Sequence, residues 1–130
     1  ISVPFSTGVG PPTLPRKYAC IKIPVLFHTV AGTLLALAES RMGSCSDFAW
    51  TDLVVRRSQS GGASWSNGDF VRSEPGQTIG NAAPVQLRKS GRILLPHTLN
   101  NSQIWLTYSD TDGASWATPR QVRRKYKRPL

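Results

Sequence analysis

The chain has 130 residues, a net charge of +9, 39% hydrophobic residues and four Trp. This composition indicates a packed domain rather than a disordered chain. No apolar stretch reaches the roughly 18–20 residues that cross a bilayer, so we expect no membrane span. Six of the 16 basic residues lie within positions 120–130. A terminal basic run is typical of a solvated tail, and no RNA-reading motif accompanies it, so we expect no nucleic-acid partner.

The order of elements along the chain predicts an all-β fold. Residues 1–17 are rich in Pro and Gly and predict an extended leader. Short apolar runs separated by turn residues follow, and one of them, Thr33–Ser40, also has helix propensity, but its length and flanking Gly32 favour a strand. The pattern predicts two four-stranded antiparallel units. The eight expected strands are Ala19–Phe27, Thr33–Ser40, Asp52–Arg57, Asp69–Arg72, Ala83–Leu87, Arg92–Thr98, Gln103–Tyr108 and Thr118–Val122.

An octapeptide repeats within the chain. Ser58–Trp65 and Ser109–Trp116 share the pattern Ser-x-x-x-Gly-Ala-Ser-Trp, 51 residues apart. A repeat of this period is typical of folds assembled from copies of one supersecondary unit. Gly allows a positive φ in a tight turn, Ser satisfies backbone groups, and Trp fills the space between strands. We therefore expect both boxes, as these two octapeptides are called below, to be structural.

The first unit is longer than the second. When Gly32 is aligned with Gly91, the first unit carries about eight extra residues before its box, and they fall within Arg41–Ala49. Loops on a repeated scaffold are where function is usually placed. This loop contains Cys45 and Asp47, so it is the first place to look for chemistry.

Two cysteines, Cys20 and Cys45, allow one disulfide and lack metal-ligand spacing. A bridge would imply an oxidising compartment, whereas two free thiols would not, and the sequence leaves both open. Asn100-Asn101-Ser102 is a formal glycosylation sequon, which slightly favours a secreted or lumenal protein. We predict neither a metal site nor a cofactor.

Several segments together resemble the sialidase (neuraminidase) family. Tyr18–Pro24 is similar to that family's Arg-Ile-Pro segment, and Leu35–Arg41 to its Leu-Ala-x-Ala-Glu-x-Arg stretch. Cys45–Asp47 with Asp52–Ser58 resembles the loop and strand that precede its first Asp box, and Gly80–Val85 its Asn-Pro-x-Pro segment. Both boxes depart from the family pattern Ser-x-Asp-x-Gly-x-x-Trp.

Each box differs from this family pattern at its third residue. Ser60 and Thr111 stand where the family has Asp.

This resemblance implies a six-bladed β-propeller, of which the chain would supply about two blades. Residues 18–123 would be the propeller portion, with 18–75 as the first blade, 76–123 as the second and 124–130 as a basic tail. Two blades cannot close the ring. We therefore expect a truncated product or a piece of a longer sialidase.

The resemblance also implies roles for five residues. Asp47 matches the acid that protonates the leaving glycosidic oxygen and later activates water. Arg41 matches an arginine in the sugar pocket, and Glu39 a carboxylate that supports the cationic cluster. Asn81 lies where the family approaches the sugar's side groups. Lys22 takes the first position of the three-arginine cluster that binds the sialic acid carboxylate.

Lys22 departs from the family's arginine. An ammonium offers a point charge where a guanidinium offers two parallel donors, so the substitution weakens carboxylate binding by about 1–3 kcal/mol. Alternation along a strand places Cys20, Lys22 and Pro24 on one face, which makes an ion pair between Lys22 and Glu39 on the next strand plausible. Read without the resemblance, Asp47 is a turn former, and Glu39 and Arg41 are an exposed strand end.

We therefore predict that the chain is the N-terminal part of an exo-sialidase, an enzyme that hydrolyses terminal sialic acids from glycoconjugates. The family's Tyr nucleophile and two of its three arginines come from later blades, so we expect this chain alone to lack strong activity. The alternative is a non-catalytic sialidase-like module that binds glycans or a protein. His28 and His97 match no functional position, and we expect them to be ordinary strand-end side chains.

Overall fold

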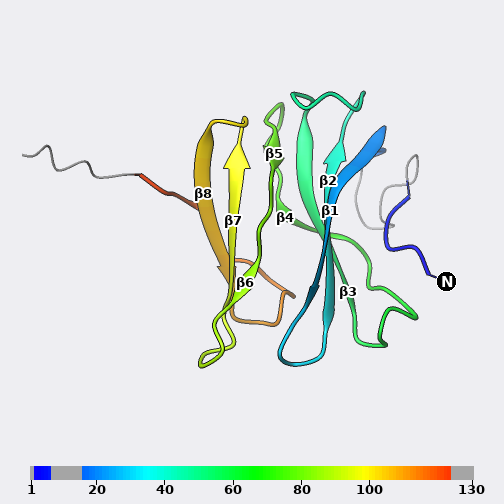
Figure 1. The fold of residues 1–130 in the computed structure, drawn as a ribbon. Coiled ribbons are helices and arrows are strands. Elements are labelled where there is room, and N and C mark those ends of the chain that lie inside the picture. The colour runs from blue at the N-terminus through cyan, green and yellow to red at the C-terminus, as the bar shows by residue number, and fades with distance from the viewer. Residues whose placement is uncertain (1, 7–15, 124–130) are drawn as a thin grey trace, which may run out of the picture.

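The computed structural model describes residues 2–6 and 16–123, which form nine strands and no helix (Figure 1). Two antiparallel sheets stand side by side. The first has the order β1-β2-β3-β4, from β1 (Cys20–His28), β2 (Leu34–Arg41), β3 (Thr51–Ser58) and β4 (Asp69–Arg72). The second has the order β5-β7-β8-β9, with β6 also paired to β7, from β5 (Ile79–Gly80), β6 (Val85–Gln86), β7 (Ile93–Leu99), β8 (Gln103–Ser109) and β9 (Arg120–Gln121).

The all-β prediction is confirmed, including a strand rather than a helix at 34–41, and one strand was missed. The second sheet has five strands rather than four, because Ile79–Gly80 forms β5. Two residues are too few for an alternating pattern to show in the sequence. Residues 124–130 and most of the predicted leader lie outside the described part of the chain. The described residues form no helix, and so none that is long and apolar enough to cross a membrane.

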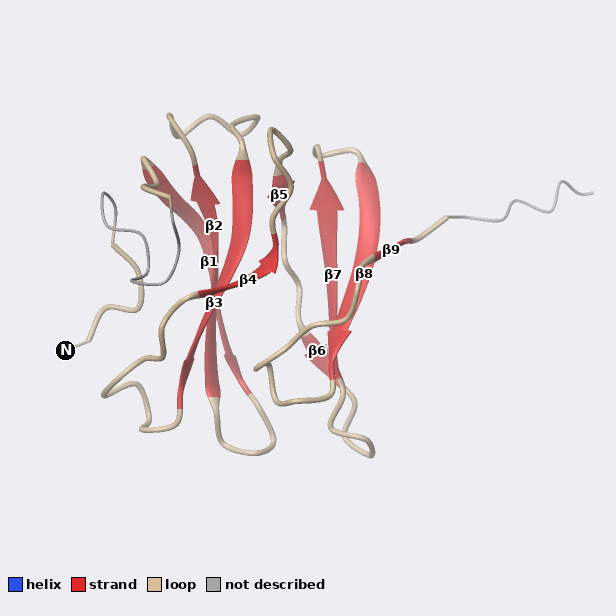
Figure 2. Ribbon diagram, turned by 180° about the vertical axis from the view of Figure 1, so that it is seen from behind, coloured by secondary structure: helices blue, strands red, loops and turns tan. Residues whose placement is uncertain are grey.

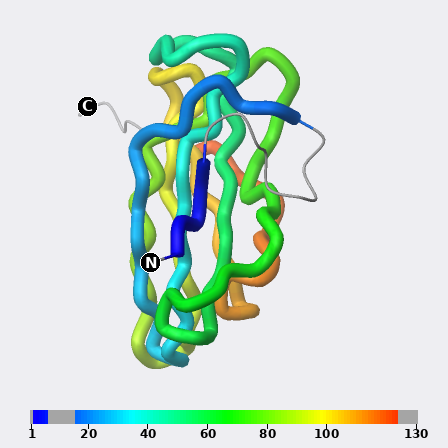
Figure 3. Tube along the Cα trace, turned by 90° about the vertical axis from the view of Figure 1, so that its right-hand side faces the viewer, coloured from blue at the N-terminus to red at the C-terminus, as the bar shows by residue number. Residues whose placement is uncertain are grey.

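The core lies between the two sheets. Leu35 and Leu37 of β2 belong to the same hydrophobic cluster as Ile93 and Leu95 of β7, and all four side chains are fully buried. Alternate residues of β7 are buried, as expected for a strand with one face on a core. The other face of the first sheet is partly covered by residues 2–6, which lie across it in Figure 3.

The two boxes form the same kind of turn. The Ser58 hydroxyl accepts hydrogen bonds from the backbone N–H of Ser60 and Gly62, and Ser109 does the same for Thr111 and Gly113. Both turns lie at the end of the sheets opposite to the β2–β3 loop (Figure 2). This geometry supports a structural role for the boxes.

The second box also joins the sheets. A Cβ on Gly113 would lie 2.6 Å from a methyl carbon of Leu35 on β2, so this position must be Gly. Its φ of 79° is a second reason. Asp112 forms an ion pair with Arg57 of β3 and a hydrogen bond with Thr33. The turn of the second repeat therefore fixes the orientation of the first sheet.

Candidate functional site

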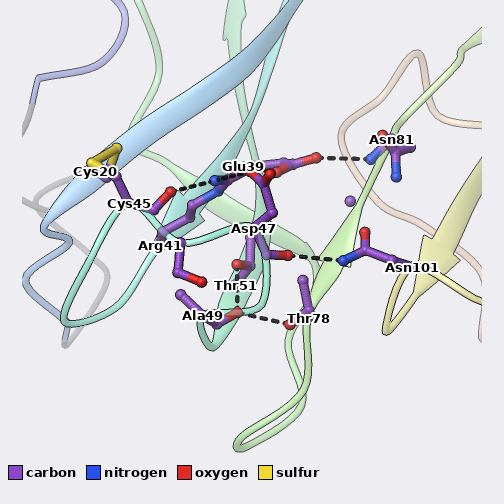
Figure 4. A network of polar contacts seen from close by, with 12 residues as sticks. Cys20, Glu39, Arg41, Cys45, Asp47, Ala49, Thr51, Thr78, Asn81 and Asn101 are labelled. Atoms are coloured by element: carbon purple, nitrogen blue, oxygen red, sulfur yellow. Dashed lines mark hydrogen bonds and ion pairs between the residues drawn. A yellow bond between two sulfur atoms is a disulfide. The ribbon is translucent and has the colours of Figure 1, made fainter.

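A cleft opens at the end of the sheets that carries the β2–β3 loop and the β7–β8 turn. Its volume is about 360 Å³. Residues from both sheets line it: Ile23, Glu39, Arg41, Asp47, Phe48, Asn81 and Asn101. Four of the five side chains expected from the sequence are therefore brought together, since Glu39, Arg41, Asp47 and Asn81 are all present. Figure 4 shows how they lie around Arg41.

Arg41 is the centre of the site. Its side chain is buried, and one terminal nitrogen, Nη2, donates to Glu39 Oε2 at 2.7 Å. The other, Nη1, donates to the carbonyl of Cys45 at 2.7 Å and to Asp47 Oδ1 at 2.8 Å. Burial disfavours the charged form, but the hydrogen bonds to the two carboxylates outweigh it and raise the pKa of Arg41. The cation is therefore permanent.

Arg41 retains donor capacity. A guanidinium has five N–H groups, and the three hydrogen bonds above leave two of them without a partner among the described residues. One is the buried Nε–H. Leaving a buried N–H unsatisfied costs about 1–3 kcal/mol.

Glu39 is held from two sides. Oε2 binds Arg41, and Oε1 accepts the backbone N–H of Asn81 at 2.9 Å. Asn81 has a φ of 53°, and its side-chain amide donates to Thr98 rather than to the carboxylate. The N–H reaches Glu39 because the preceding residue, Gly80, has no side chain to keep the two sheets apart.

The loop that carries Asp47 is pinned at several points. A disulfide joins Cys45 to Cys20 on β1, which resolves the two possibilities left by the sequence. Within the loop, the hydroxyl of Ser46 accepts the N–H of Phe48 at 3.1 Å. From the second sheet, Asn101 donates to the carbonyl of Asp47 at 2.8 Å (Figure 4). The position of Asp47 thus depends on both sheets.

Asp47 itself faces solvent. Its side chain is 75% exposed although it is paired with buried Arg41. The hydrogen bond and charge of Arg41 lower the pKa of this carboxyl, and the charge of Lys22 adds to the effect. In the free chain Asp47 is therefore ionised at neutral pH.

Lys22 is placed differently from expectation. It lies opposite Glu39 in the β1–β2 register, but it is exposed, and no salt bridge involves it in the described part of the chain. Glu39 pairs with Arg41 instead. Lys22 is also absent from the residues that line the cleft, although its charge acts on Asp47.

A β-bulge explains part of this difference. The register of β1 shifts between Lys22 and Val25, and Ile23 has a φ of 50°, which is rare for a β-branched residue. Alternation therefore fails here: Val25, rather than Pro24, lies opposite Leu37. The prediction that Cys20, Lys22 and Pro24 share one face of the strand is therefore wrong for Pro24, which lies beyond the bulge.

Comparison with known proteins identifies the fold. No family model matches the chain. Among solved structures, the Hadza microbial sialidase Hz136 superimposes with a TM-score of 0.72 over 80% of this chain, at 23% sequence identity. The chain has a sialidase-like fold. It spans 26% of the Hz136 chain, so this sialidase-like unit corresponds to about a quarter of that protein. At this identity the likeness establishes the fold alone.

Two residues that line the cleft were not expected. Phe48 is 79% exposed beside Asp47, and Asn101 comes from the β7–β8 turn. The sequence could have indicated Phe48, because it is an aromatic residue directly after the candidate acid Asp47. Nothing local indicated Asn101, because its contact with Asp47 spans 54 positions.

One of the two histidines lies elsewhere than expected. His97 is not at a strand end but inside β7, fully buried, where Nε2 lies 3.1 Å from Arg72 Nη1. Alternation places it on the core face of β7, which the sequence pattern alone could have shown. His28 ends β1 and is exposed. Among residues 2–6 and 16–123, no group of three or more His, Cys, Asp or Glu side chains is arranged to hold a metal ion.

Proposed function

We propose that the chain is the N-terminal part of an exo-sialidase, which removes terminal sialic acids from glycoconjugates. One observation carries this: on a sialidase-like fold, a single buried arginine in an open cleft links a supporting carboxylate to an exposed one. Arg41 is that arginine, Glu39 the support and Asp47 the exposed group.

The cleft suits the charge of the proposed substrate. A sialoside carries a carboxylate on its anomeric carbon, and binding it requires fixed donors. Arg41 lines the cleft, carries a fixed positive charge and has one Nη2–H that no described residue accepts, while its other unpaired N–H, on Nε, is buried. Lys22 adds a nearby positive charge, although as a point charge it gives no bidentate contact. The side chain of Asn81 borders the cleft and would contact the sugar's substituents.

Asp47 would supply the proton. In the proposed reaction its carboxyl protonates the leaving glycosidic oxygen, the glycosidic bond breaks, and the carboxylate then accepts a proton from the attacking water. Sialidases use a Tyr as the nucleophile, which would have to come from other blades of the propeller. The isolated chain is therefore expected to bind the substrate without turning it over efficiently.

The low pKa of Asp47 is an obstacle that substrate binding can remove. In the free chain, Arg41 holds Asp47 ionised, and an ionised carboxyl cannot act as an acid. A sialoside carboxylate that engages Arg41 competes for its donors and adds a second negative charge. Both effects raise the pKa of Asp47, so protonation would accompany binding.

A second candidate is a non-catalytic glycan-binding module. The observation that favours it is the same ion pair, since a carboxylate kept ionised by Arg41 is better suited to accepting hydrogen bonds than to donating a proton. Lys22 in place of arginine points the same way. Both candidate functions have the same proposed ligand, a sialylated glycan.

The experiment that separates the two measures hydrolysis of a fluorogenic sialoside by the protein translated from the complete coding sequence, and by its Asp47→Asn variant. The exo-sialidase proposal expects hydrolysis that the substitution reduces by about 10²-fold or more, with substrate binding retained. Binding of the sialoside without hydrolysis in either protein would favour the module. Equal hydrolysis by both would remove Asp47 from the acid role.

A further inference from the structure

The turn between β7 and β8 consists of Asn100, Asn101 and Ser102, and its backbone geometry accounts for the two Asn residues. Asn100 and Asn101 have φ values of 51° and 54°, and the N–H of Ser102 donates to the carbonyl of Leu99 at 3.2 Å. Positive φ at both central residues defines a type I′ turn, which favours Asn. The turn makes no demand on the Ser102 side chain, whose hydroxyl has no hydrogen bond within the described residues. The Ser102 hydroxyl is therefore not used by the turn itself.

We propose that Asn100 is an acceptor for an N-linked glycan. Asn100, Asn101 and Ser102 are all exposed, so the Asn-x-Ser motif stands on the surface in a hairpin turn. The middle residue is Asn rather than Pro, which the motif excludes. The turn projects from the same end of the sheets as the β2–β3 loop (Figure 1).

The side-chain amide of Asn100 keeps one N–H beyond its contacts in the folded turn. Asn100 Oδ1 accepts the N–H of Thr78 at 2.9 Å, and Nδ2 donates to Gln77 Oε1 at 2.5 Å. The amide nitrogen has two hydrogens, and these contacts use only one. In the transfer, Nδ2 bonds to the anomeric carbon of a lipid-diphosphate-linked oligosaccharide. The bond from that carbon to the diphosphate breaks, the lipid diphosphate leaves with the electron pair, and Nδ2 loses one proton.

The disulfide supplies an independent observation about compartment. Both cysteines of the chain are used in the Cys20–Cys45 bridge, and none remains free. Such bridges form and persist in oxidising environments such as the lumen of the secretory pathway, where N-glycosylation also takes place. The disulfide thus fits the compartment in which the Asn-x-Ser motif would be used.

The experiment directs the 130-residue chain into the endoplasmic reticulum of eukaryotic cells with a cleavable signal peptide. The secreted protein is treated with peptide N-glycosidase and its intact mass is measured before and after. We expect a mass excess that the enzyme removes, and peptide mapping that assigns it to Asn100. Ser102→Thr should keep the glycan, whereas Ser102→Ala should abolish it while leaving the side-chain contacts of Asn100 in place.

A control variant makes a negative result decisive. Arg88→Asn, combined with Ser102→Ala, creates an Asn-Lys-Ser motif in the exposed turn between β6 and β7. If this variant is glycosylated and the unaltered chain is not, the chain has met the transferase and Asn100 is not an acceptor. That result would overturn the proposal. A glycan on the unaltered chain that Ser102→Ala removes would establish it.

Discussion

Gly80 lies directly against Glu39. A Cβ at position 80 would come within 2.9 Å of the carboxyl carbon of Glu39 and closer still to its Oε1. Gly80 is on β5 of the second sheet and Glu39 on β2 of the first, so the absence of one side chain allows the carboxylate to reach across between sheets. Through Glu39, this contact positions Arg41.

We therefore predict that Gly80→Ala displaces the Glu39 carboxylate. The substitution should cost about 1–3 kcal/mol of the free energy of unfolding, as overpacking usually does, and weaken binding of a sialoside. The measurement is urea unfolding of the single variants and of the pair with Glu39→Ala. In the Glu39→Ala background the added methyl should cost much less. Additive costs would contradict the contact.

Removal of the disulfide should loosen the loop that carries Asp47. Because the bridge links residues 25 positions apart, we predict that the paired variant Cys20→Ser with Cys45→Ser loses about 2–4 kcal/mol of the free energy of unfolding. Urea unfolding with and without a reductant measures this. The unaltered chain should lose stability on reduction, while the double variant should not respond. Equal responses would show that the bridge does not form.

The pH dependence of stability should report on His97. Burial lowers its pKa, and the adjacent Arg72 adds to the shift. Its hydrogen bonds to the Leu95 carbonyl and to Arg72 require a neutral ring with the proton on Nδ1.

The folded state consequently binds fewer protons than the unfolded state below the ordinary His pKa. The free energy of unfolding should fall as the pH drops below about 6.5. Urea midpoints between pH 7.5 and 5 test this, with His97→Gln expected to flatten the slope. His28→Gln, at an exposed position, should leave it unchanged. A slope that follows His28 instead would refute the assignment.

The two boxes should respond alike to the same substitution. Ser58→Ala and Ser109→Ala each remove a buried acceptor from two backbone N–H groups, so each should cost about 1–3 kcal/mol. Ser60→Ala removes an exposed acceptor that water can replace, and should cost less. Thermal unfolding of the three variants compares them. A harmless Ser109→Ala would mean that the second turn does not depend on its cap.

The sequence was informative where the pattern is local. Alternating apolar residues and the repeat predicted two antiparallel sheets, and the misalignment of the repeats located the loop around Asp47. The bulge at Ile23 was not predictable, because nothing in Lys22-Ile23-Pro24 shows that a β-branched residue takes a positive φ. Asn101 was missed for a different reason: it reaches Asp47 only because the two sheets pack together.

The central claim is that the cleft around Arg41 binds the carboxylate of a sialic acid, and direct titration tests it best. Amide spectra of the 130-residue chain at pH 7 are recorded with increasing methyl α-sialoside, with methyl galactoside as the neutral control. We predict saturable changes at Asp47, Asn81 and Asn101, none of them with galactoside. Arg41→Lys should weaken binding about tenfold, equivalent to about 1.4 kcal/mol. Absence of these changes, or an equal response to galactoside, would contradict the account.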